Sequence, residues 1–69
     1  MIVKLQRNWA GDAILIYNKD QSVFLELQGD AAFDVAEQFG LERLTKCYAQ
    51  ARLDGETLLL EEKVPPRDW

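Results

Sequence analysis

The sequence contains no histidine and a single cysteine, Cys47, in 69 residues. A structural zinc site needs four Cys or His side chains at close spacing, so the sequence excludes one. An intrachain disulfide is excluded as well. General acid–base catalysis most often uses histidine, and a nucleophilic thiol needs an activating base. The sequence therefore points to a protein that is not an enzyme, with Cys47 acting as a small hydrophobic residue in the core.

Long apolar runs and glycine-rich loops are also missing. The longest continuous apolar run is Ala13 to Tyr17, far short of the roughly twenty residues that cross a bilayer. Residues 1–7 alternate apolar with polar side chains, which is not the pattern of a signal peptide. The four glycines are isolated, so no phosphate-binding loop of the ATP or dinucleotide type is present. We expect a cytoplasmic protein without a membrane segment or a cofactor.

The excess of negative charge is modest, because eight basic and twelve acidic residues give a net charge of −4. An acidic protein repels phosphate backbones at long range, which disfavours nucleic-acid binding. The hydrophobic fraction of 48% argues against disorder. A chain this short has a thin stability margin, and without crosslinks or metal it depends on a dense core or on a partner.

Three segments of the N-terminal half have the composition of β-strands, namely residues 1–7, 13–17 and 22–28. The loop between the first two carries Trp9. A turn around Lys19 and Asp20 predicts that Ile16 lies opposite Val23 and that Ile14 lies opposite Leu25. That register would place four aliphatic side chains on one face.

A helix is predicted over residues 31–39, because apolar residues recur at helical spacing on one side. This stripe comprises Ala32, Val35, Ala36 and Phe39. Asp30 is the expected N-cap. Gly40 can end the helix in the left-handed conformation, and Leu41 can then pack back on the last turn.

The last predicted element is a hairpin of residues 44–53 and 56–64 around Asp54-Gly55, a pair typical of a type I′ turn. In this register Leu53 pairs with Glu56, and the pairs on the apolar face are Ala51 with Leu58 and Ala49 with Leu60. Pro65 and Pro66 cannot donate backbone hydrogen bonds, so they end the strand. Residues 65–69 then form a short C-terminal tail.

Together the elements predict one α+β domain over residues 1–69, with the order β-β-β-α-β-β. The expected architecture is a small antiparallel sheet or partly open barrel of about five strands, with one helix packed on the sheet. This element order, and nothing more specific, is shared with the OB-fold barrel. Four residues, Leu15, Phe24, Tyr48 and Leu59, fall opposite the aliphatic or small-residue stripes. Either another subunit covers part of them, or the assigned faces are inverted in the first hairpin.

The leading hypothesis is a non-enzymatic protein-interaction module. It would be a homodimer or a small inhibitor or accessory subunit of a larger complex, and the sequence leaves open whether it belongs to a host machine or to a mobile element. Large aromatic residues are enriched at interface hot spots. The expected partner-binding residues are Trp9, Trp69, Tyr48 and Leu59.

A second hypothesis is an OB-like domain that binds single-stranded nucleic acid. On the outer face of the last hairpin, three basic residues surround an aromatic one: Lys46, Arg52 and Lys63 around Tyr48. Basic and aromatic side chains on a sheet can contact phosphates and stack on bases. The net negative charge weighs against this alternative, and basic residues on an exposed strand also protect its edge and aid solubility.

Overall fold

The computed structural model describes all residues from Met1 to Trp69 and contains five strands and one helix. The elements are β1 (Ile2–Arg7), β2 (Ala13–Tyr17), β3 (Val23–Gln28), α1 (Asp30–Phe39), β4 (Lys46–Asp54) and β5 (Thr57–Val64). The predicted fold class and element order are confirmed. The helix is not one that could span a membrane.

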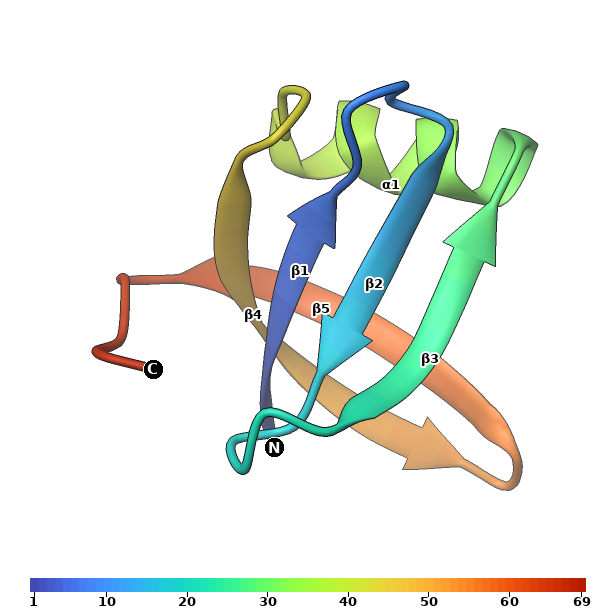
Figure 1. Ribbon diagram of the computed structural model, residues 1–69. Coiled ribbons are helices and arrows are strands. Elements are labelled where there is room, and N and C mark those ends of the chain that lie inside the picture. The colour runs from blue at the N-terminus through green and yellow to red at the C-terminus, as the bar shows by residue number, and fades with distance from the viewer.

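All five strands belong to one antiparallel sheet in the order β3-β2-β1-β4-β5. The sheet bends so that β4 and β5 cross behind β1, β2 and β3, while α1 lies across one end (Figure 1). Because β3 and β5 are not hydrogen-bonded to each other, the barrel stays open along the seam between them. Residues of β3, α1 and β5 line an apolar groove at this seam.

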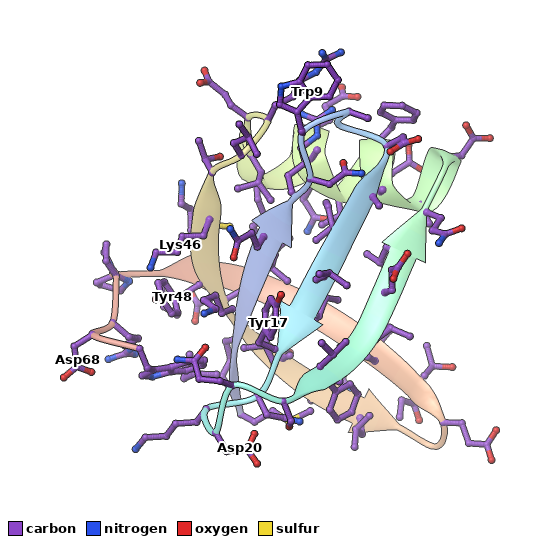
Figure 2. The ribbon with its side chains drawn as sticks, in the orientation of Figure 1. Trp9, Tyr17, Asp20, Lys46, Tyr48 and Asp68 are labelled. Carbon is purple, nitrogen blue, oxygen red and sulfur yellow. The ribbon has the colours of Figure 1, made fainter.

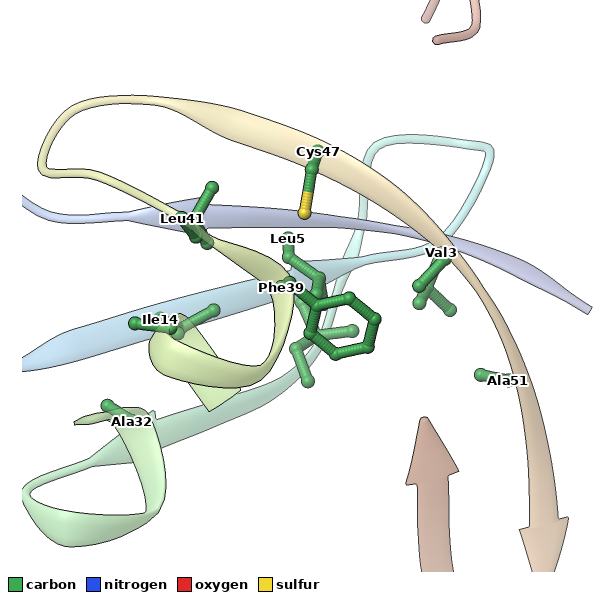
Figure 3. Packing of buried hydrophobic residues seen from close by; sticks show 11 residues of the cluster. Val3, Leu5, Ile14, Ala32, Phe39, Leu41, Cys47 and Ala51 are labelled. Atoms are coloured by element: carbon green, nitrogen blue, oxygen red, sulfur yellow. The ribbon is translucent and has the colours of Figure 1, made fainter. Parts of the chain in front are cut away.

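The core fills the concave side of the sheet, where alternate strand residues meet the helix (Figure 3). Val3 and Leu5 of β1 are fully buried, as are Ala49 and Ala51 of β4. The Phe39 ring reaches from α1 toward Val3 and Ala51. The small side chains of Ala49 and Ala51 on β4 leave space for this ring. The helix can therefore pack closely against the sheet.

Both ends of α1 are set by glycine. Gly40 is left-handed with φ 63°, and the amide of Leu41 donates to the carbonyl of Ala36 at 2.8 Å. This C-terminal cap was predicted and is confirmed. The prediction that Asp30 is the N-cap is wrong, because Gly29 occupies that position with φ 59° and no side chain caps the helix. Positive φ at Gly29 turns the chain from β3 directly into the helix, so Asp30 already belongs to the first turn.

The register predicted for β2 and β3 is wrong by two residues. The observed pairs are Ile14 with Leu27, Ile16 with Leu25, and Tyr17 with Val23. The connection is longer than the sequence suggested, because the amide of Asn18 donates to the carbonyl of Ser22 at 2.9 Å. Phe24 is the extra residue of a bulge. The bulge moves Val23 away from the face of Leu25 and Leu27 and onto the face of Tyr17.

The last hairpin is also shifted by two residues. Observed pairs are Asp54 with Thr57, Leu53 with Leu58, and Ala51 with Leu60. The central turn residues are therefore Gly55 and Glu56. A type I′ turn needs positive φ at both, but only Gly55 has it, at 66°. A shift of two residues keeps Leu58 and Leu60 on the predicted apolar face. Beyond them, an irregularity between Ala49 and Ala51 changes the register again and places Lys63 opposite Ala49.

Candidate interaction surfaces

Trp9 projects from the loop between β1 and β2, near α1, and is 74% exposed (Figure 2). The loop is held by the Asn8 side chain, whose Oδ1 accepts the amides of Gly11 at 2.8 Å and Ala13 at 3.1 Å. Arg7 donates from Nε to the carbonyl of Gly11 at 2.9 Å. The loop therefore presents an exposed indole on a hydrogen-bonded scaffold.

Tyr48 and Trp69 contact each other on the convex side of the sheet. Their rings meet edge to face, with centroids 5.2 Å apart, and the Tyr48 hydroxyl donates to the Trp69 carbonyl. As a result Tyr48 is only 2% exposed. Ile14 and Ile16 are buried, as the assigned faces of the first hairpin require. The alternative in which these faces are inverted is therefore wrong. The side chain of Tyr48 is covered by the chain's own C-terminal tail.

A buried lysine completes this convex cluster and was not anticipated from the sequence. Lys4 lies in β1 between Tyr17 of β2 and Tyr48 of β4. Its Nζ donates to Oε1 of Gln21 at 2.7 Å and lies 4.8 Å from the centroid of the Tyr17 ring. The ammonium group thus has a hydrogen-bond acceptor and an aromatic face, which compensate for its loss of water.

Another surface feature, which we call the basic hollow, lies where β4, the end of β5 and the tail meet. It has a volume of about 330 Å³ and is surrounded by Lys46, Lys63 and Arg67, with Tyr48 and Pro66 also in its wall. Two of the three basic residues in the nucleic-acid hypothesis, Lys46 and Lys63, are brought together here. Figure 2 shows Lys46 beside Tyr48. Arg67 was not singled out, because only the folded tail brings it to this place.

Arg52, the remaining basic residue of that hypothesis, does not line the hollow. Its Nε donates to Oε2 of Glu61 at 3.2 Å, and both side chains are exposed. Cys47 also borders the hollow; burial raises the pKa of its thiol, and the positive charge of Lys63 opposes this shift. The thiol is thus held in its neutral form, the state expected of a core residue.

A further feature, which we call the seam groove, is an apolar depression of about 190 Å³ between β3, α1 and β5. Leu59, one of the expected partner-binding residues, lies in its wall. The other apolar lining residues are Ile16, Leu25, Leu27, Ala31, Val35, Leu58 and Leu60, and Gln38 is the one polar residue among them. The sequence did not reveal this groove, because it forms only where the curved sheet fails to close.

The elements around the seam groove are strongly acidic. Together β3, α1 and β5 carry six acidic residues, which are Glu26, Asp30, Asp34, Glu37, Glu61 and Glu62. Their single basic residue, Lys63, lines the basic hollow instead. The elements that form the apolar groove therefore carry a net negative charge, which the ion pair between Glu61 and Arg52 offsets in part.

Metal-binding residues are not gathered anywhere in the fold, since no group of three or more Cys, Asp or Glu side chains is placed to hold an ion. Every buried side-chain nitrogen or oxygen has a hydrogen-bond partner. Comparisons with protein-family models, curated proteins and solved structures found no match for this chain.

Proposed function

We propose that this protein is a non-enzymatic, cytoplasmic protein-interaction domain that binds an extended segment of another protein along the seam groove. The observation that carries the proposal is the apolar groove bordered by two strand edges without hydrogen-bond partners. A strand edge with a neighbouring apolar groove suits recognition by strand addition, in which backbone hydrogen bonds and alternate side-chain pockets act together.

The incoming strand is expected to pair with β3 and not with β5. Charged residues and bulges protect sheet edges from pairing. The β5 edge has both, since Glu61 and Glu62 lie where the pairing with β4 becomes irregular, and Lys63 follows. Past the bulge at Phe24, β3 offers the regular stretch of residues 25–28, in which Glu26 is the one charged residue and Leu25 is 38% exposed.

Charge favours a different partner over a second copy of this chain. A second copy would bring the same acidic elements and a net charge of −4 against an acidic groove. Like charges brought together at an interface suppress pairing. A segment with alternating apolar side chains and flanking lysine or arginine is complementary instead. This favours the role of a small inhibitor or accessory subunit over that of a homodimer.

The proposal can be tested with a synthetic peptide of about ten residues, a length typical of a β-strand and its flanks, in which leucine alternates with lysine. A matched peptide has glutamate in place of lysine. We expect the lysine peptide to bind and to slow amide hydrogen exchange in β3, whereas the glutamate peptide does neither. Binding measured by calorimetry should weaken as salt is added, because salt screens the charge attraction.

The matched variants for this test are Leu25→Ser in the groove and Leu53→Ser outside it, two exposed leucines on strands. Losing a leucine contact worth about 1.4 kcal/mol weakens binding about tenfold, so Leu25→Ser should do this and Leu53→Ser should not. Equal binding of both peptides would contradict the proposal. So would sedimentation showing a dimer that Leu25→Ser dissociates, since the groove would then bind a second copy.

A further inference from the structure

The geometry points to a second binding site, independent of the seam groove: we propose that the basic hollow binds a small organic phosphate. Lys46, Lys63 and Arg67 would hold the phosphate group, and Val64 and Pro66 would contact the apolar part of the molecule. Lysine and arginine are the side chains that proteins use for phosphate, lysine as a point charge and arginine through its planar fork of donors.

The three cations around the hollow have no anionic partner of their own. The one ion pair in the protein joins Arg52 to Glu61, so no carboxylate lies within ion-pair distance of Lys46, Lys63 or Arg67. Three like charges around one hollow repel each other, and the protein as a whole is acidic. A bound anion would remove this repulsion.

The hollow is assembled by residues that are far apart in the sequence. The pairing of Ala49 with Lys63 places Lys63 beside the β4 residues that line the hollow. The contact between Trp69 and Tyr48 returns the tail to the sheet and so places Arg67 on the remaining side. Trp69 is therefore a positioning residue for Arg67.

The size and surroundings of the hollow favour a small molecule over a nucleic acid. Its volume of about 330 Å³ lies within the range of roughly 300–1,000 Å³ found for small-molecule sites. Stacking on bases needs an exposed aromatic face, but Tyr48 is covered by Trp69. Arg52, which would extend a phosphate track along β4, is engaged by Glu61.

Phenyl phosphate is a suitable probe because it combines both parts of the expected ligand. We expect backbone amide signals of Lys46, Lys63 and Arg67 to shift during an NMR titration with it. Inorganic phosphate, which lacks the apolar part, should bind several-fold more weakly, and phenol should not bind. Absence of shifts at these three residues at millimolar phenyl phosphate, or equal binding of phenol, would overturn the proposal.

Lys63→Gln should weaken phenyl phosphate binding at least tenfold. Lys19→Gln, which makes the same charge change in the turn between β2 and β3, is the matched control and should leave binding unchanged. Equal weakening by both variants would mean that only the overall charge matters and would contradict a defined site. Trp69→Ala should also weaken binding, because the tail no longer holds Arg67 in place.

An oligothymidine of about ten nucleotides separates the proposed ligand from single-stranded nucleic acid. We expect it to bind no more tightly than inorganic phosphate and to leave the signals of Arg52 unchanged. Tighter binding than phenyl phosphate, with shifts that extend to Arg52, would replace the small-molecule proposal with a nucleic-acid surface.

Discussion

At the scale of single residues, Leu44 is the least expected feature. It adopts φ 61° although it is not glycine, and it is 62% exposed. The left-handed conformation costs a side chain about 1–2 kcal/mol. Gln21 is also left-handed, but its side chain accepts the hydrogen bond of Lys4. Leu44 has no comparable compensation, because its turn is closed by bonds between Thr45 and Glu42.

We therefore predict that Leu44→Gly raises the free energy of unfolding by about 0.5–1 kcal/mol, the relief of strain less the added flexibility of glycine. The control is Leu53→Gly, another exposed leucine that lies inside β4. That change should lower the free energy of unfolding, because glycine weakens a strand. Urea denaturation of both variants measures the difference, and a loss of stability in both would show that Leu44 is not strained.

At the scale of elements, the C-terminal tail acts as part of the fold. Pro65 and Pro66 end β5, as predicted, but the five residues do not simply extend away from the sheet. Trp69 returns to cover Tyr48. One apolar residue for which the sequence suggested an outside partner is thus covered within the chain.

Tyr48→Phe tests this role of the tail, because it removes the hydroxyl that donates to Trp69 and keeps the ring. Loss of one hydrogen bond should lower the free energy of unfolding by about 0.5–1.5 kcal/mol. Nuclear Overhauser contacts between residue 48 and Trp69 should also weaken. Tyr17→Phe is the control, since no hydrogen bond joins the Tyr17 hydroxyl to another residue. Similar losses in both variants would contradict a specific role of the Tyr48 hydroxyl.

At the scale of the whole molecule, stability is centred on β1 and falls toward the open seam. β1 is paired on both sides, and its residues Val3 and Leu5 are fully buried. β3 and β5 are each paired on one side only, and five of the six residues of β3 are exposed. The elements next to the proposed binding groove are therefore those with the least internal support.

Native-state hydrogen exchange should follow this gradient. We predict that the amides of β1 exchange slowest, close to the rate of global unfolding, and that those of β3 exchange fastest among the strands. Local opening needs less free energy where fewer contacts are broken. Equal protection of β1 and β3 in the free protein would mean that β3 is already covered, for example by self-association at the concentrations used.

Much of this fold follows from local patterns in the sequence. The strands, the helix and its end at Gly40 were predicted because alternation, helical spacing and glycine act over a few residues. Both hairpin registers were wrong, because register depends on the length of a turn and on bulges such as the one at Phe24. Buried Lys4 was not anticipated, because its partner Gln21 comes from a turn far along the chain.

Local sequence patterns specify the element order and most strand faces, except where a bulge shifts a residue such as Val23. The composition also lacks the residues that disulfides and histidine chemistry require. Tertiary folding left the sheet open between β3 and β5 and brought the tail back over Tyr48. It also gathered Lys46, Lys63 and Arg67 around one hollow. Periodicity and turns depend on residues that are neighbours in the sequence. Grooves and charge clusters instead arise where the curvature of the sheet brings distant segments together.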